Sequence, residues 1–142
     1  MSWPTAGARD AGAAGDGGGR AVIGIGLDAV EVDRFRRVLA RTPAVARRLF
    51  TDEERAYAAR FVDSAPRLAG RFAAKEATMK ALGVGLGAFG FHDVEVVREA
   101  SGAPSLRLSG VAAALAAERG VTSFHLSITH TDVTAHAVVA AL

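Results

Sequence analysis

The chain has 142 residues, half of them hydrophobic, with a formal net charge of +2 and no cysteine. This length and composition indicate one globular domain with a buried core, and the missing cysteines exclude disulfides, thiolate zinc sites and a cysteine nucleophile. The charge is too small to argue for nucleic-acid binding by itself, and no apolar run reaches the ~18 residues of a membrane span. The N-terminus lacks the pattern of a secretory signal, so we expect a cytoplasmic protein.

Residues 1–20 are rich in glycine and alanine and contain few large apolar side chains. Such a segment cannot offset the entropy that is lost when a chain becomes ordered. We therefore expect a flexible tail over residues 1–20 and a single folded domain over residues 21–142.

The first predicted strand covers residues 21–28, and its two faces differ. We expect the apolar face to be the core face; it carries Ala21, Ile23, Ile25 and Leu27. On the other face, Gly24 and Gly26 leave the backbone bare beside Asp28, which lets a ligand or another backbone approach closely. Asp28 fits two roles, the cap of a following helix or the ligand of a bound group, and the strand pattern does not decide between them.

A basic helix is predicted over residues 30–41. Arg34, Arg37 and Arg41 recur on one of its faces. Two interpretations remain open for these arginines. They form either a solvated surface or a docking surface for an acidic partner, because guanidinium groups pair with carboxylates and phosphates.

Two further helices are indicated by their start signals. Thr51 and Glu54 match a capping box, which predicts a helix over residues 52–62. Ser64 is expected to cap the next helix, which runs to a stop at Gly83.

This last helix carries the most unusual charge pattern of the chain. Lys75 and Lys80 are the two lysines among 17 basic residues, and they flank Glu76. At helical spacing Lys75 falls inside an apolar stripe, which consists of Leu68, Phe72, Met79 and Leu82. A buried charge must be paired, bound to a metal or shifted in pKa. The alternative is an exposed ion pair between Glu76 and Lys80 at i, i+4.

Residues 85–90 match the pattern GxGxxG, but a helix precedes them and a strand follows. A dinucleotide site requires the opposite order, so we reject that interpretation. The segment 83–90 is either a loop that approaches a ligand closely or a plain structural turn.

The remaining elements are predicted to be two hairpins and a helix. Residues 91–98 and 104–108 form the first hairpin, residues 109–119 a helix, and residues 121–130 and 133–142 the second hairpin. If Thr131 and Asp132 are the whole turn, three apolar residues face three partners across the second hairpin. These residues are Phe124, Leu126 and Ile128, opposite Val139, Ala137 and Ala135.

Two histidines in the second hairpin raise the question of a metal site. His125 and His130 are five residues apart, so a regular strand points them to opposite faces, and we do not expect zinc. By spacing alone, His130 is typical of a histidine at a strand end.

Three motifs together resemble one known family. They are Gly24–Asp28 with Arg34 downstream, Gly70–Ala77 with Lys80, and Ser127–Thr131. In this order they resemble the holo-[acyl-carrier-protein] synthases, the small trimeric 4′-phosphopantetheinyl transferases, and the likeness extends over residues 22–142.

The resemblance implies an α+β fold, a compact single domain of antiparallel strands packed with helices, that assembles as a homotrimer. It also implies Mg²⁺-dependent transfer of 4′-phosphopantetheine from coenzyme A to a serine of an apo acyl carrier protein, with release of adenosine 3′,5′-bisphosphate. In such enzymes the site forms between neighbouring protomers. We expect neither a nucleic acid nor a membrane as a partner.

By motif match, Asp28 and Glu76 are expected to hold the metal, and Mg²⁺ suits a site of one or two carboxylates completed by substrate phosphate. Glu76 or a metal-bound water would take the serine proton, and Lys80 would stabilise the leaving phosphate. The resemblance also implies coenzyme A contacts by Arg71, Lys75, Lys80, Gly83, Gly85 and His130. Carrier-protein contacts are implied for Arg34 and Arg41. The alternative is a non-catalytic trimeric module that binds a nucleotide or an acidic partner.

Overall fold

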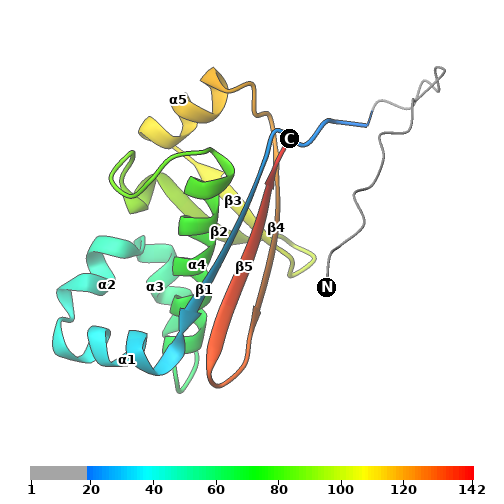
Figure 1. Ribbon diagram of the computed structural model, residues 1–142. Helices are drawn as coiled ribbons and strands as arrows, with labels where there is room; N and C mark the ends of the chain where they lie inside the picture. The colour runs from blue at the N-terminus through cyan, green and yellow to red at the C-terminus, as the bar shows by residue number, and fades with distance from the viewer. Residues whose placement is uncertain (1–18) are drawn as a thin grey trace, which may run out of the picture.

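The computed structural model describes residues 19–142, so the predicted tail lies outside the described residues except for Gly19 and Arg20. The long helix α4 (Ala65–Ala81) lies between a three-stranded antiparallel sheet and a smaller layer of two strands and a helix (Figure 1). The sheet has the order β1-β5-β4, formed by Gly24–Glu31, Thr134–Ala141 and Phe124–His130. This arrangement confirms the expected α+β fold.

The other elements surround the two ends of α4. The first group of helices is α1 (Val32–Arg41), α2 (Ala44–Leu49) and α3 (Asp52–Ala58). The second group is the 3-10 turn η1 (Phe91–Asp93), the hairpin of β2 (Val94–Arg98) and β3 (Pro104–Leu108), and α5 (Gly110–Glu118). Among residues 19–142, no helix is both long and apolar enough to cross a bilayer.

Glycines let α4 lie directly on strand β1. A Cβ atom at Gly26 would lie 1.7 Å from the carbonyl oxygen of Ala77, and one at Gly24 would lie 2.0 Å from that of Ala81. No side chain fits into this space, so the glycine face of β1 is the core face.

The prediction of the core face of β1 was therefore wrong. Ile25 and Leu27 point away from α4 and are 65% and 58% exposed. The strand alternates as predicted, but the face with the smaller residues is the buried one. The backbone of α4 lies directly on that face and leaves no room for larger side chains.

Strand β1 also continues farther than predicted, to Glu31, and α1 begins at Val32. Asp28 thus lies within the strand, paired across the ladder with Ala137, and Glu31 occupies the N-cap position. The interpretation of Asp28 as a helix cap was wrong, which leaves its carboxylate available for a site.

The capping box at Thr51 is confirmed. The Thr51 hydroxyl accepts a hydrogen bond from the backbone N–H of Glu54, and the Glu54 carboxylate accepts one from the N–H of Thr51 at 2.9 Å. Helix α3 ends at Ala58, four residues earlier than expected. At the next start signal, the Ser64 side chain makes no cap bond, and Asp63 instead accepts from the N–H of Ala65 at 3.1 Å.

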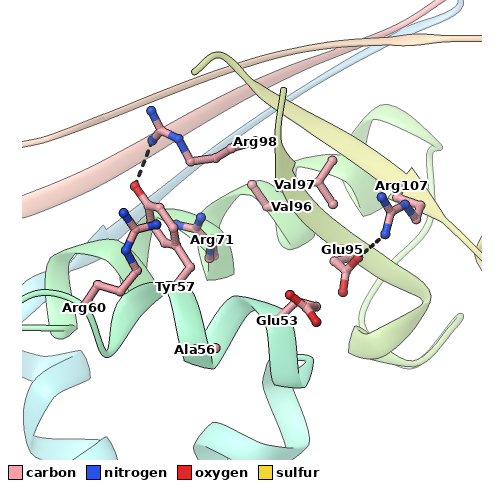
Figure 2. Close-up of a pocket in the computed structure, with 10 residues that line it drawn as sticks. All are labelled: Glu53, Ala56, Tyr57, Arg60, Arg71, Glu95, Val96, Val97, Arg98 and Arg107. Atoms are coloured by element: carbon pink, nitrogen blue, oxygen red, sulfur yellow. Dashed lines mark hydrogen bonds and ion pairs between the residues drawn. The ribbon is translucent and has the colours of Figure 1, made fainter. Parts of the chain in front are cut away.

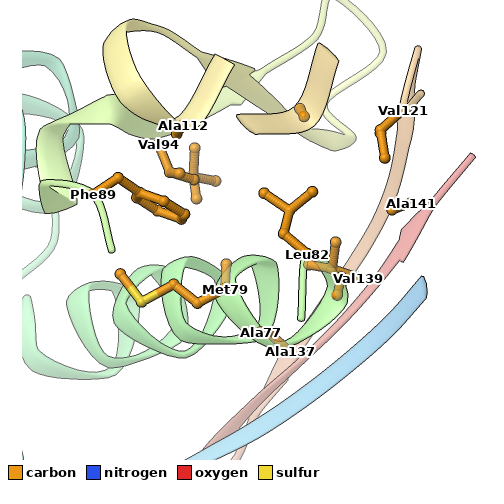
Figure 3. Packing of buried hydrophobic residues seen from close by; sticks show 14 of the residues in the cluster. Ala77, Met79, Leu82, Phe89, Val94, Ala112, Val121, Ala137, Val139 and Ala141 are labelled. Carbon is orange, nitrogen blue, oxygen red and sulfur yellow. The ribbon is translucent and has the colours of Figure 1, made fainter. Parts of the chain in front are cut away.

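Two hydrophobic clusters fill the interior. The larger one joins α4 to the sheet, the β2–β3 hairpin and α5, as Figure 3 shows around Met79, Leu82 and Val94. The second cluster lies between the beginning of α4 and the helices α1 and α3, and Phe35 and Phe50 belong to it. Helix α4 contributes to both clusters, so the residues on its remaining surface have fixed positions.

The C-terminal hairpin keeps the predicted faces with a different register. Phe124, Leu126 and Ile128 pair with Ala141, Val139 and Ala137, two residues beyond the predicted partners. The connection also includes Val133, and the N–H of Thr131 donates to the carbonyl of Thr134. Because side chains alternate with a period of two, a shift of two residues leaves each one on its expected face.

Candidate active site

Helix α4 and strand β1 bring Asp28, Glu76 and Lys80 together. The Lys80 ammonium group donates to the Asp28 carboxylate at 3.0 Å and to the carbonyl oxygen of Leu27 at 2.9 Å. Its ion-pair partner is therefore Asp28, and the alternative interpretation, a surface pair with Glu76, is not formed among the described residues. The close contact between the backbones of α4 and β1 allows this short lysine bridge.

The two carboxylates are close enough to influence each other. Burial raises the pKa of Glu76, the negative charge of Asp28 and a hydrogen bond with it raise this pKa further, and Lys80 lowers it. Two neighbouring carboxylates resist being ionised at the same time unless a cation lies between them. The pair is thus a suitable place for a positive ion.

The donor set fits magnesium better than a metal with a complete protein cage. Among residues 19–142, no group of three or more His, Cys, Asp or Glu side chains gathers as a metal site. Mg²⁺ prefers hard oxygen ligands and typically combines one or two carboxylates with waters and substrate phosphate. Asp28 and Glu76 match such a site, which substrate oxygens would complete.

Two cavities meet at Glu76. The larger one, of about 350 Å³, extends from Asp28 and Glu76 towards helix α1 and is lined by Arg34 and the apolar side chains Phe35, Val38 and Phe72. The smaller one, of about 80 Å³, is lined by Glu76, Lys80 and the loop residues Gly85 and Leu86. The glycine loop thus borders the same cavity as Glu76 and Lys80, and whether it approaches a ligand stays a prediction.

Two further predicted residues, Gly83 and Arg41, line neither of these two cavities. Gly83 follows the end of α4 with a φ of +67°, and the Arg119 side chain covers it. Arg41 is exposed in the last turn of α1, on the helix that brings Arg34 to the rim of the larger cavity.

Lys75 has a different role from the one expected. Its side chain is fully buried, its ammonium group lies 2.7 Å from the Glu54 carboxylate, and it donates to the carbonyl of Phe91 at 2.8 Å. Burial lowers its pKa, and Glu54 opposes that change. The prediction that a buried lysine must be paired is confirmed, whereas the expected phosphate contact does not fit this arrangement because the internal partners enclose the charge.

A separate, positively charged region surrounds Tyr57. The guanidinium carbons of Arg71, Arg98 and Arg60 lie 4.1, 5.4 and 5.6 Å from the centre of its ring. Arg98 also donates to the Tyr57 hydroxyl at 2.8 Å, and the group lines a cavity of about 520 Å³ (Figure 2). Three guanidinium groups on one ring form a concentrated positive surface.

Arg71 is the most strongly desolvated member of this region. It is 6% exposed, and its Nε atom has no hydrogen-bond partner among the described residues. Burial is the largest cause of its lowered pKa. A neighbouring cavity of about 260 Å³ contains both Arg71 and His130, so the structure brings these two predicted residues together.

Sequence reasoning missed Tyr57, Arg60 and Arg98 as parts of this region. Arg98 is 41 residues from Tyr57 along the chain and reaches it from strand β2. No local pattern signals such a contact. The cavities around Arg71 share no lining residue with those around Glu76, so the two charged regions are separate within one protomer.

Comparison with known proteins assigns the chain to a family. Residues 24–139 match the family model described as the 4′-phosphopantetheinyl transferase superfamily. The chain belongs to this superfamily. The match covers well over half of the chain and confirms the family that the three motifs indicated.

Holo-[acyl-carrier-protein] synthases are similar to this phosphopantetheinyl transferase over nearly their whole length. That of Frankia casuarinae is 52% identical over 121 residues, which are 85% of this chain and 98% of the relative. That of Streptomyces coelicolor is 48% identical over 120 residues, or 84% of this chain and 97% of the relative.

Solved structures agree with the sequence comparison. The holo-[acyl-carrier-protein] synthase from Neisseria meningitidis superposes with a TM-score of 0.79 at 32% identity and covers 86% of this chain and 99% of its own. The Helicobacter pylori enzyme, solved in complex with coenzyme A, has a TM-score of 0.74 at 30% identity, with coverages of 83% and 99%.

Proposed function

We propose that this chain transfers the 4′-phosphopantetheine arm of coenzyme A to a serine of an apo acyl carrier protein. The observation that carries the proposal is the meeting of Asp28, Glu76 and Lys80 at one cavity edge, in a chain of this superfamily. Relatives that are about half identical bear the name of this activity, and a similar structure is a coenzyme A complex.

Asp28 and Glu76 would hold Mg²⁺, which when bound neutralises negative charge on the pyrophosphate of coenzyme A. The serine oxygen attacks the β-phosphorus, and the bond from that phosphorus to the bridging oxygen breaks. The phosphopantetheine arm stays on the serine, and adenosine 3′,5′-bisphosphate leaves with the bridging oxygen.

Within this reaction the chain's own side chains have separate tasks. Glu76, whose pKa is raised by burial and by Asp28, is suited to accept the serine proton. Lys80 lies beside both carboxylates and offers a compact positive charge to the leaving phosphate. The glycine loop around Gly85 leaves room for the cofactor beside them.

The positive region around Arg71 and His130 would hold the far phosphates of coenzyme A. A buried guanidinium with an unpartnered Nε needs an anionic partner, and phosphate accepts from its planar donors. Because this region lies in cavities separate from Glu76, we assign the two halves of the site to neighbouring protomers.

A homotrimer would explain the exposed face of the sheet. Ile25 and Leu27 project from β1. On the neighbouring strand β5, Val138 pairs with Leu27 and is 42% exposed. Contiguous exposed apolar surface is typical of an interaction site. A second copy of the chain would cover it and bring the two halves of the site together.

Helix α1 would receive the carrier protein. Arg34 and Arg41 offer positive charge on this helix, and the cavity that Arg34 lines together with the carboxylates also contains apolar Val38 and Phe72. An acidic helix with an apolar residue facing inward would match both properties.

Intact-mass spectrometry tests the proposal. Apo acyl carrier protein mixed with this chain, coenzyme A and Mg²⁺ should gain the mass of one phosphopantetheine group, and it should gain none when its acceptor serine is replaced. Omitting Mg²⁺ with a chelator present should stop the gain. An unmodified carrier in the complete mixture would overturn the proposal.

A further inference from the structure

The lysine at the candidate site is held in a way that differs from the other lysine. Lys80 is 54% exposed, whereas the Asp28 side chain that accepts its hydrogen bond is only 12% exposed. Its ammonium group has two acceptors, a carboxylate oxygen of Asp28 and the backbone carbonyl of Leu27. Lys80 is thus the solvent-facing partner of a largely covered carboxylate.

The local charge balance leaves the site short of positive charge. Between them, the two carboxylates Asp28 and Glu76 have one ion-pair partner among the described residues, the Lys80 ammonium group on Asp28; Arg34 lines the same cavity but forms no ion pair with either carboxylate. A divalent cation between them would balance both carboxylates. It would then compete with Lys80 for Asp28, because two positive charges on one carboxylate repel each other.

Lys75 provides the contrast within the same helix. Its charge is enclosed by Glu54 and Phe91 with no exposed surface, so its pairing is permanent in the folded chain. Partly exposed ion pairs contribute little to stability, so breaking one costs little. Breaking a buried pair is costly because it leaves an unpaired charge away from water. One lysine is therefore fixed, and the other is replaceable.

A lysine at position 80 suits an ammonium group that can leave Asp28. All basic residues of the chain other than Lys75 and Lys80 are arginine. An arginine would bind the Asp28 carboxylate through a planar fork with two parallel bonds, which resists displacement. Lysine carries a single-point charge on a flexible stem and can move between neighbouring oxygens.

We propose that Lys80 is a displaceable counter-ion that occupies Asp28 in the substrate-free chain and competes there with the divalent cation. When cation and coenzyme A bind, the ammonium group leaves Asp28 for the phosphate oxygens. The inference rests on the proposed function, since it uses the metal and phosphate of that reaction. Its consequence is that the substrate-free chain binds the cation weakly and that coenzyme A strengthens this binding.

Lysine-selective isotope labelling observes the displacement directly, because the whole chain has two lysines. The full-length protein is labelled on lysine and titrated with Mg²⁺ alone, then with Mg²⁺ and coenzyme A. The Lys80 side-chain signals should shift in both titrations, while the Lys75 signals stay in place and serve as the internal reference. The variant Lys80→Met assigns the two signals.

Cation affinity gives the second readout. Mn²⁺ binding without substrate, followed by the loss of the free-ion electron paramagnetic resonance signal, should tighten about two- to fivefold in Lys80→Met, the equivalent of one partly exposed ion pair. Arg34→Met is the matched control, because it removes one positive charge from the lining of the same cavity without breaking a bond to Asp28. It should change the affinity less than Lys80→Met does.

Defined results overturn the inference. Lys80 signals that stay in place when the cation binds would overturn it. Equal Mn²⁺ affinities of the wild type and Lys80→Met would also overturn it, as would an equal gain in Mn²⁺ affinity in Lys80→Met and Arg34→Met. If the wild type binds no cation even with coenzyme A present, the metal site of the proposed function fails, and the inference fails with it. Cation binding with a stationary Lys80 removes the inference alone.

Discussion

Replacing Lys75 with methionine removes the positive member of a fully buried ion pair. Both side chains of the pair have no exposed surface, and their charged atoms lie 2.7 Å apart. Methionine has a similar length, so the substitution leaves the Glu54 carboxylate buried without its counter-charge and creates little empty space. We expect Lys75→Met to lower the free energy of unfolding because a buried unpaired charge is costly.

The magnitude follows from the remaining partners of Glu54. Breaking a buried ion pair by removing one member typically costs about 3–5 kcal/mol. Here the carboxylate keeps two backbone donors, the N–H groups of Thr51 and Val96, each at 2.9 Å. These bonds compensate part of the loss, so we expect about 3 kcal/mol for Lys75→Met.

The double variant Lys75→Met with Glu54→Gln removes both charges and keeps an oxygen for the backbone donors. We expect it to cost about 1–2 kcal/mol, less than either single change, because neither charge is left unpaired. The assay is urea unfolding followed by circular dichroism, at one fixed protomer concentration because assembly affects apparent stability. A cost below about 1 kcal/mol for Lys75→Met, or a double variant whose loss equals the sum of the singles, would show that the two buried charges do not stabilise each other.

The single variant Glu54→Gln adds a pH dependence of known sign. Burial lowers the pKa of Lys75, and the glutamine no longer opposes this effect. The folded state then binds the lysine proton less tightly than the unfolded chain does, so the stability of Glu54→Gln should rise with pH until the unfolded lysine also loses its proton. A stability that falls or stays flat over this alkaline range would contradict the assignment.

Three further predictions concern the site, the contact beneath it and the exposed face. The pKa of Glu76 is raised in the folded state by burial and by Asp28, so its ionisation costs stability as pH rises above the usual range of a glutamate. Glu76→Gln should therefore abolish transfer yet increase resistance to urea at about pH 8, with little change at about pH 4. Equal stability at both pH values would contradict this. Gly26→Ala should cost about 3 kcal/mol or more because its Cβ would overlap the Ala77 carbonyl, whereas Gly85→Ala, with no atom within 4 Å, should be near neutral in urea unfolding. Leu27→Asp should dissociate the proposed trimer in analytical ultracentrifugation, while Val111→Asp on α5, equally exposed at 58%, should leave it intact; matching sedimentation of the two variants would exclude this face as the interface.

Local patterns predicted the elements of this fold better than their surroundings. The capping box at Thr51, the long helix with its two lysines and the hairpins follow from residues that are close in sequence, and the structure contains all of them. The core face of β1 could not be predicted in the same way, because a strand pattern identifies an apolar face without identifying what covers it. At Gly26 the determining neighbour is the backbone of a helix some fifty residues away.

The candidate site was only partly predictable, because some of its contacts are tertiary and leave no local pattern. Asp28, Glu76 and Lys80 are each recognisable by residue type and position, and the family motifs assign all three to one site from sequence alone. The partner of Lys75 was not recognisable, because Glu54 already had a complete local explanation in the capping box. Its second role depends on a tertiary contact across 21 residues, and the ring of arginines around Tyr57 depends on one across 41.

We propose that one transfer site is built from two copies of the chain, with the carboxylates from one protomer and Arg71 from its neighbour. Coexpression of the two inactive variants Glu76→Gln and Arg71→Leu is the sharpest test of this shared site. If equal amounts of the two variants assemble at random, about a quarter of all sites would combine an intact Glu76 with an intact Arg71. Carrier modification, measured by intact mass, should return to about that fraction of the wild-type rate. Activity no higher than that of the separate variants would exclude a site shared between protomers.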